Sequence, residues 1–531
     1  MTLTPIREGV AGPTMVPAMP TARRFRGRFA VLRLVASGVV VAIMADSTAT
    51  TLAIPVLSRD PLAAALPLSE VTWVSTVNFA AVAALLAIAG RFADLLGRRS
   101  ILALGLALYG LGATTVIAAP SWTLLLAGRV AQGVGAALMF PASLALLLGE
   151  LPANRRAGAI ALWSASSGIG ALALQGGGGW LLTEYGWRGL FLPGAGLAAA
   201  LLMLTPALPR NRGTRQGVPD LFGAVLLIGA VAGAVLAISQ GSLWGWTSVR
   251  TLACAGGGGL LLAGAIAISW RHRAGAIDMS LWRRPGFLWA GATSSMYGAA
   301  SFVVLAMGPL YLRNAEFDTS TIGLWLTPIS IAMILSSPTA APISRRIGIN
   351  GVIYGGALTL GTGCALMLAQ PYPNLWCLLG AVMLGTGFGF LSTGTFMVGS
   401  MAADPSQYAS AVGAINTARM LGGAIGVAGA SVLVDHPMLA GPMPGFSTVL
   451  VACLAVAVLL GVAALIRVAV AATSNRPRRP SLREAEAELV LLRSLLAELR
   501  DSFVQVRSEA EHELARFGVQ DPSAFRALDQ R

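Results

Sequence analysis

Three ionisable side chains lie in stretches of sequence that are otherwise apolar: Asp46, Arg129 and Arg419. A charge inside an apolar membrane helix is costly, so each of the three is a candidate for function. Asp46 lies about 22 Å from the cytoplasmic end of its stretch. Arg129 lies about 10 Å from the outer end of its own stretch, which crosses in the opposite direction. In a bilayer core about 30 Å thick, both side chains are therefore at a similar depth. The two side chains can therefore pair.

An aspartate beside an arginine suits proton coupling. Burial favours the neutral carboxylic acid, whereas a nearby guanidinium favours the carboxylate. A conformational change that moves the arginine away would capture a proton, and its return would release one. The alternatives are a static buried ion pair and an acid that faces water. We expect Asp46 to be the protonation site and Arg129 to be its partner.

The segment from 90 to 99 reads Gly-Arg-Phe-Ala-Asp-Leu-Leu-Gly-Arg-Arg and separates two apolar stretches. So short a connection makes the two flanking helices antiparallel neighbours, and its arginines mark the cytoplasmic side of the membrane. We call this segment the 90–99 loop and expect it to hold one transport conformation closed at that side. The residues expected to form this gate are Gly90, Arg91, Asp94, Gly97, Arg98 and Arg99.

Further polar side chains within the apolar stretches are candidates for a mostly apolar substrate cavity with a few polar contacts. They are Asn78, Gln132, Gln175, Asn416 and Arg419. For Gln175 a hydrogen bond to a neighbouring helix is the favoured alternative. Four glycines are expected to allow close packing between helices, which small residues favour in membranes: Gly133, Gly170, Gly178 and Gly179.

The elements that must position these residues are membrane helices. The chain has 531 residues, of which 55% are hydrophobic and 11% are charged, whereas a soluble domain carries about a quarter charged residues. Apolar stretches long enough to span a bilayer recur about fourteen times. Their approximate bounds are 31–57, 71–90, 100–119, 122–148, 157–182, 188–207, 220–240, 251–270, 286–312, 319–342, 350–370, 374–400, 407–434 and 446–472.

Charge and repetition predict how these helices are organised. Arginines gather in alternate loops, which predicts a multi-pass membrane protein with both termini cytoplasmic. We expect it to lie in the cell (plasma) membrane. A degenerate copy of the 90–99 loop at 341–348 suggests two related halves. The expected parts are a tail at 1–30, six-helix bundles at 31–207 and 286–472, an inserted helix pair at 220–271 and a tail at 473–531.

The tail after residue 473 has a different pattern. Apolar residues recur in heptads from Leu482 to Ala510, with acids and arginines between them, which is typical of a coiled-coil helix. Self-association through this helix and a helix lying on the cytoplasmic face of the bundle fit the pattern equally well.

Composition also argues against several classes of protein. The net charge of +14 is scattered between apolar stretches, so we expect attraction to anionic lipid and no nucleic-acid partner. The chain has no lysine, so it cannot form the phosphate-binding loop of an ATP-driven pump. The four cysteines and three histidines lack metal-ligand spacing. We expect no metal, no cofactor and no enzymatic activity.

Several motifs together resemble one family of transporters. The 90–99 loop resembles the loop between the second and third helices of the major facilitator superfamily. Residues 46–55 resemble the first-span signature of its fourteen-span drug:proton antiporters, with Thr51 in place of asparagine. Residues 129–136 resemble the fourth-span motif, whose arginine is implicated in proton transfer. Residues 416–426 resemble the thirteenth span.

One motif departs from this family. The fifth-span pattern Gly-x-x-x-Gly-Pro-x-x-Gly-Gly is matched at Gly170, Gly178 and Gly179, but Leu174 and Gln175 replace the central Gly-Pro. The missing proline removes an expected helix kink. The departure bears on the direction of antiport and not on the fold.

The resemblance implies an all-α polytopic membrane protein with the major facilitator fold. It implies a proton antiporter that exports amphiphilic, hydrophobic or cationic compounds, with antibiotic resistance as the outcome. A first alternative is a transporter of lipids or another endogenous hydrophobic molecule without strict proton antiport, which the fifth-span departure favours. A second is a membrane scaffold or sensor that does not transport and recruits partners through its tail.

Overall fold

The computed structural model describes residues 22–210, 213, 220–272, 275–314, 319–369, 374–435 and 444–474, and five single positions between 494 and 504. The heptads predicted between Leu482 and Ala510 therefore lie almost entirely outside the described residues, as does most of the N-terminal tail. The predictions for both tails stay predictions.

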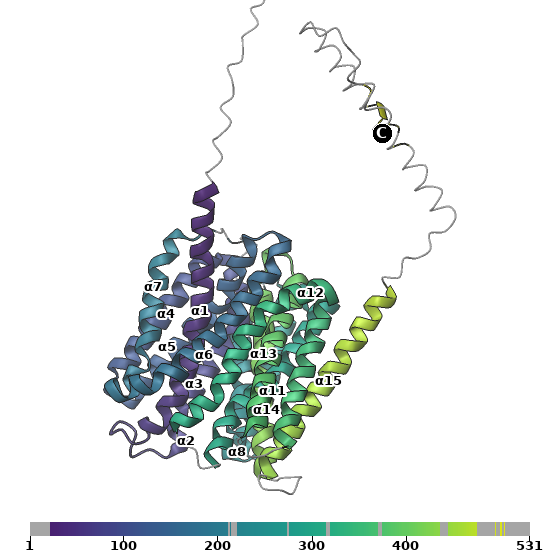
Figure 1. Cartoon of the computed structure of the whole chain (residues 1–531). Coiled ribbons are helices and arrows are strands. Elements are labelled where there is room, and N and C mark those ends of the chain that lie inside the picture. The colour runs from purple at the N-terminus through teal and green to yellow at the C-terminus, as the bar shows by residue number, and fades with distance from the viewer. Residues whose placement is uncertain are drawn as a thin grey trace, which may run out of the picture. The chain divides into compact units, whose positions relative to one another are not determined.

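The described chain is helical throughout its regular structure, and the helices up to Val468 belong to one compact unit. Figure 1 shows them side by side as a bundle. The first half contains α1 (Ala22–Leu57), α2 (Leu68–Val71), α3 (Trp73–Leu96), α4 (Arg98–Ala118), α5 (Trp122–Gly149), α6 (Ala153–Gly189) and α7 (Leu192–Leu204). Next come α8 (Leu221–Trp244), α9 (Val249–Arg271) and α10 (Met279–Trp282). The second half contains α11 (Pro285–Asn314), α12 (Thr319–Ala369), α13 (Leu375–Met401), α14 (Tyr408–Asp435) and α15 (Pro444–Ser474).

Polar residues at the helix starts define several boundaries. The Asp220 carboxylate accepts a hydrogen bond from the Gly223 backbone amide at 2.8 Å and caps α8. The Asn374 side chain accepts from the amides of Trp376 and Cys377 and caps α13. Such caps satisfy amide groups that have no partner within the helix, so these two helices begin where the sequence supplies a polar side chain.

Twelve helices of the described residues are long and apolar enough to cross a membrane, which is two fewer than expected. One difference lies in α12, an element of 51 residues in which Gly348, with a φ of 78°, marks a kink between two helices. The two predicted spans at 319–342 and 350–370 lie on either side of this kink and are counted as one. The other lies at Leu192–Ala207, an apolar helix of fewer than 18 residues. The predicted count of fourteen spans is not confirmed.

The connection between α3 and α4 has a counterpart in the second half. Gly97 separates α3 from α4 with a φ of 110°, and Gly348 interrupts α12 with a φ of 78°. Only glycine adopts such angles readily. The two glycines are the last residues of the 90–97 and 341–348 segments, which resemble each other in sequence. A glycine with positive φ therefore occurs at the same position of both segments.

Glycines bring the helices of the bundle into close contact. A Cβ added at Gly170 of α6 would lie 2.4 Å from the Val41 carbonyl oxygen of α1, and one at Gly133 of α5 would lie 2.7 Å from the Asn78 carbonyl oxygen of α3. At Gly178 it would lie 2.6 Å from the Leu52 side chain. At Gly179 it would meet no atom within 4 Å, so the structure gives no close packing there.

Candidate functional site

Asp46 of α1 and Arg129 of α5 form a buried ion pair. The Arg129 Nη1 atom lies 2.8 Å from Asp46 Oδ1 and 3.0 Å from Asp46 Oδ2. Asp46 is 7% exposed and Arg129 is 1% exposed. Because α1 and α5 run past one another, side chains far apart in sequence meet at one level of the bundle, as the depth estimate requires.

Other side chains complete the hydrogen bonding of this pair. Gln132 accepts from Arg129 Nη1 at 2.7 Å and donates from Nε2 to Asp46 Oδ1 at 3.0 Å. Arg129 Nη2 donates to the Thr50 hydroxyl at 2.8 Å. Arg129 Nε donates to the Val74 carbonyl of α3 at 3.0 Å. We call Asp46, Thr50, Arg129 and Gln132 the α1–α5 cluster.

The α1–α5 cluster joins three helices through one guanidinium. Asn78 of α3 adds a hydrogen bond from Nδ2 to the Arg129 carbonyl at 3.1 Å. A buried ion pair of this kind is maintained by its hydrogen bonds, and the loss of one partner leaves an uncompensated charge. Protonation of Asp46 would have that effect, so the cluster can link proton binding to the relative position of α1, α3 and α5.

Asp94 connects the 90–99 loop to the second half of the chain. Its Oδ1 atom accepts from Arg98 Nη2 at 2.8 Å and from Arg98 Nε at 3.0 Å. Its Oδ2 atom accepts from both the backbone amide and the hydroxyl of Ser410, each at 2.8 Å. Asp94 is 4% exposed. One carboxylate therefore holds α3 and α4 of the first half against the start of α14.

The arginines of the loop extend these contacts. Arg98 donates to the carbonyls of Ala145 in α5 and Pro405 before α14. Arg99 donates to the Leu208 carbonyl at 3.2 Å. Arg91 Nη1 lies 2.8 Å from the Asp278 carboxylate, which also accepts from Gln407 Nε2 at 2.9 Å. The segment between α9 and α11 thus takes part in the contact between the two halves.

Backbone contacts close the bundle at the same end. A Cβ added at Gly90 of α3 would lie 2.2 Å from the Ala409 carbonyl oxygen of α14, and one at Gly413 would lie 2.5 Å from the Leu86 carbonyl oxygen. Deeper in the bundle, the Phe396 ring of α13 packs 5.0 Å from the Trp163 ring. Helices α3 and α14 of the two halves therefore touch backbone to backbone at the end that carries the 90–99 loop.

The residues predicted for a substrate cavity have different partners in the structure, and the cavity itself stays a prediction. Asn78 and Gln132 bond to Arg129. Gln175 of α6 accepts a 3.0 Å hydrogen bond from the Ser330 hydroxyl of α12, which is the favoured alternative for that residue. Asn416 is buried on α14. Arg419 lies one turn further along α14 and contacts α11 and α13.

The missing proline of the fifth-span pattern has a visible result in α6. The helix continues through Leu174 and Gln175, and its one non-helical residue is Gly186, at φ 65°. Without the proline there is no ring to clash with a preceding carbonyl, so the helix stays regular where the family pattern predicts a kink.

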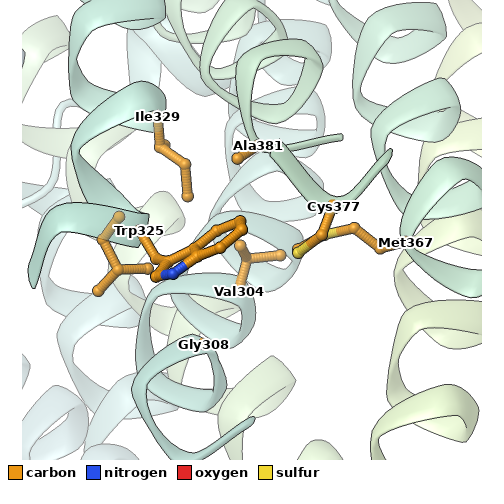
Figure 2. A pocket seen from close by; sticks show the side chains of 8 residues that line it. Val304, Gly308, Trp325, Ile329, Met367, Cys377 and Ala381 are labelled. Carbon is orange, nitrogen blue, oxygen red and sulfur yellow. The ribbon is translucent and has the colours of Figure 1, made fainter. Parts of the chain in front are cut away.

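A pocket in the second half lies apart from all of these residues. It is apolar, and Figure 2 shows the Trp325 ring extending into it, with Met367 and Cys377 beyond the ring. Its volume of about 30 Å³ is far below the roughly 300–1,000 Å³ of pockets that hold drug-sized ligands. This pocket is too small to hold such a ligand in the present conformation.

Sequence reasoning missed several residues of the site. Thr50 lies four residues after Asp46 and so shares its helix face, a signal that could have identified it. Asp278, Gln407 and Ser410 gave no such signal. Each contacts a residue more than a hundred positions away, and their own neighbourhood in the sequence is that of an ordinary polar loop.

Replacing Asp94 with asparagine should slow transport without unfolding the protein. The amide keeps one acceptor oxygen, places an NH2 group where the other oxygen accepts, and loses the charge. Hydrogen bonds to charged groups are worth about 1.5–3 kcal/mol. We expect a decrease of roughly tenfold in the transport rate of reconstituted protein, since the closed state would be less populated. Asp404→Asn is the control, because its ion pair with Arg284 is largely exposed. Equal rates for Asp94→Asn and wild type would contradict a gating role.

Comparison with known proteins agrees with this architecture. The family model described as Major Facilitator Superfamily matches residues 35–427. The chain is 29% identical over 412 residues to "Multidrug resistance protein Stp" of Mycobacterium tuberculosis (strain CDC 1551 / Oshkosh), covering 76% of this chain and 75% of that relative. It is 30% identical over 391 residues to "Methylenomycin A resistance protein" of Streptomyces coelicolor, covering 69% of this chain and 78% of that relative.

Solved structures show the same fold. The proton:xylose symporter XylE superposes with a TM-score of 0.59 at 16% sequence identity, over 82% of this chain and 95% of that one. The helices, the buried polar clusters and the family match across residues 35–427 lead to one assignment. The chain is a multi-pass membrane protein and belongs to the major facilitator superfamily.

Proposed function

We propose that this transporter exports amphiphilic, hydrophobic or cationic drugs in exchange for protons. The names of the relatives, which describe multidrug and antibiotic resistance proteins, support a drug transporter as the general class. The observation that carries the proposal of proton coupling is the α1–α5 cluster, which contains a buried carboxylate bound to a guanidinium.

The coupling follows from the hydrogen bonds of Asp46. As a carboxylate it accepts from Arg129 and Gln132, and these contacts hold α1 and α5 together. A proton on Asp46 removes the negative charge and leaves the buried guanidinium uncompensated, which is a costly arrangement. Protonation therefore favours a conformation in which Arg129 finds other partners. Ligand and proton can then drive the same change in opposite directions.

The direction of transport depends on which side the 90–99 loop occupies. Its arginines favour the cytoplasmic side, with both termini cytoplasmic and the protein in the plasma membrane. The conformation described above is then closed to the cytoplasm. In the proposed cycle, separation of α3 from α14 opens the path for a substrate from inside the cell. The two bundles at 31–207 and 286–472 are the parts proposed to move.

Substrate-dependent proton release is the experiment that tests this proposal. Purified protein in weakly buffered detergent is mixed with drugs, and a pH-sensitive dye reports protons released. We expect release from wild type and none from Asp46→Asn. Asp60→Asn is a matched control, because Asp60 is a partly exposed acid that bonds to Trp187 and lies outside the α1–α5 cluster. Drug binding without proton release from wild type would contradict antiport.

A further inference from the structure

We infer that the transported molecule carries an acidic group, such as a carboxylate, and that Arg419 binds it. This inference rests on the proposed transport function. It narrows the proposed substrates to amphiphilic compounds with an acidic group and excludes the cationic ones. Arg419 is 8% exposed and lies about 16 Å along α14, near the middle of a bilayer core about 30 Å thick. It is therefore a cation held where a charge is most costly.

Among the described residues, no ion pair includes Arg419. The acids of the second half are Glu316, Asp318, Asp404 and Asp435, and the sequence places all of them at the ends of apolar stretches. Asp435 lies sixteen residues further along α14, or about 24 Å away. Asp404 pairs with Arg284 instead.

The surroundings of Arg419 are polar and aromatic but neutral. Its Nη2 atom donates to the Thr395 hydroxyl at 3.0 Å, and Nη1 lies 3.5 Å from the Ser392 hydroxyl. The Phe396 and Tyr297 rings lie 4.5 and 4.7 Å from its Cζ atom. Its Nε atom is buried without a hydrogen-bond partner. These groups orient the guanidinium, but none supplies a full negative charge.

The contrast with Arg129 identifies what is missing. Both arginines are buried on long apolar helices, yet Arg129 has the Asp46 carboxylate and Arg419 has none. In the described part of the chain, the other buried acids serve elsewhere, since Asp94 pairs with Arg98 and Asp220 caps α8. Asp220 lies at the start of α8, whereas Arg419 lies about three turns into α14, so among the described residues no acid pairs with this guanidinium. An anionic group on the substrate would balance the Arg419 charge.

The place of Arg419 suits a substrate contact. The Phe396 ring, on which the guanidinium stacks, packs against Trp163 and Phe140 of the first half. Arg419 is therefore one side chain behind the surface where the two halves meet, and transporters of this architecture bind substrate at such an interface near the midplane. Movement of the halves would release Phe396 from Trp163 and expose the guanidinium to a ligand.

Two dyes that share a xanthene ring system but differ in charge test the inference. Fluorescein is an anion at neutral pH, and rhodamine 6G is a cation. Binding of each to purified wild type is measured by fluorescence anisotropy at one fixed pH. We expect wild type to bind fluorescein about tenfold or more tightly than rhodamine 6G, and Arg419→Gln to lose about tenfold or more of the fluorescein affinity. Its affinity for rhodamine 6G should be unchanged or higher.

Two further variants separate charge from packing. Arg419→Lys should keep part of the fluorescein preference, since it keeps the charge but not the forked geometry. Arg467→Gln removes an arginine that also stacks on an aromatic ring, Trp289, but lies at the surface, and it should leave both affinities unchanged. Thermal unfolding of each variant establishes that it is folded.

The outcomes that would overturn the inference are distinct from those that would overturn proton coupling. Three results would each show that Arg419 is structural. They are a wild-type preference for rhodamine 6G, no fluorescein binding at millimolar concentration, and an equal loss of affinity for both dyes in Arg419→Gln. The assay uses no proton gradient. A protein that prefers the anion but releases no protons would contradict the proposed antiport alone, and a protein that releases protons without charge preference would contradict this inference alone.

Discussion

Asp46→Asn should abolish transport that is driven by a proton gradient. An asparagine side chain cannot take up or release a proton at neutral pH, although it can still accept hydrogen bonds from Arg129 and Gln132. The variant also leaves the Arg129 charge uncompensated, and breaking a buried ion pair destabilises a protein by about 3–5 kcal/mol. The measurement is drug accumulation in proteoliposomes with an imposed pH gradient, together with thermal unfolding.

A second substitution separates the loss of the proton site from the loss of stability. The double variant Asp46→Asn with Arg129→Gln removes both charges, so it should recover most of the stability lost in the single variant. It should not recover transport, because it has no group that exchanges a proton at this position. Concentrative transport by Asp46→Asn would contradict the assignment of the proton site, and transport by the double variant would contradict it as well.

Gly90→Ala should also eliminate most transport, for a steric reason. The added Cβ would lie 2.2 Å from the Ala409 carbonyl oxygen, and backbone atoms cannot yield as a flexible side chain can. The two helices, α3 and α14, belong to different halves, so the variant opposes closure at the 90–99 loop. We expect transport to fall by at least about tenfold, as a shift between conformations of a few kcal/mol implies.

Hydrogen–deuterium exchange reports this change directly. If Gly90→Ala keeps the halves apart, amides near 90–99 and 405–413 should exchange faster than in wild type. Gly158→Ala is the matched control, because Gly158 is an exposed residue of α6 where an added Cβ meets no atom within 4 Å. If Gly90→Ala transports at the wild-type rate and its amides exchange at wild-type rates, the transport cycle does not need this close contact.

The ion pair of Asp46 and Arg129 could be anticipated because depth along a membrane helix follows from counting residues. The helical rise and the bilayer thickness place both side chains at one level, and the structure has them 2.8 Å apart. The 90–99 loop was recognisable from its residue types and spacing. Both predictions use only residue types and their positions along a single stretch of sequence.

The partners of the residues predicted for a substrate cavity could not be anticipated in the same way. Counting gives the depth of a residue but not the direction in which its helix faces, and that direction depends on packing with helices far along the chain. Gln132 and Arg419 are both polar residues deep in apolar stretches, yet Gln132 completes the ion pair while Arg419 lies among rings and hydroxyls of the other half. The partners of Asp94 depended on the same distant packing.

The boundary inside α12 could be anticipated as well. Hydropathy separates 319–342 from 350–370 because the arginines at 345 and 346 interrupt the apolar pattern. In the structure the torsion angles of Gly348, two residues after Arg346, mark the kink between two helices. Charge and backbone geometry therefore place this boundary within about three residues of each other.

Asp278 has a consequence for how the closed state tolerates mutation. Its carboxylate accepts hydrogen bonds from Arg91 on the first half and from Gln407 on the second. It therefore connects the same two halves that Asp94 connects through Ser410. Two carboxylates from separate segments of the chain therefore join the halves at this end. In the cycle proposed above, a substitution at one aspartate would shorten the lifetime of the closed conformation, while the other carboxylate would still hold the halves together.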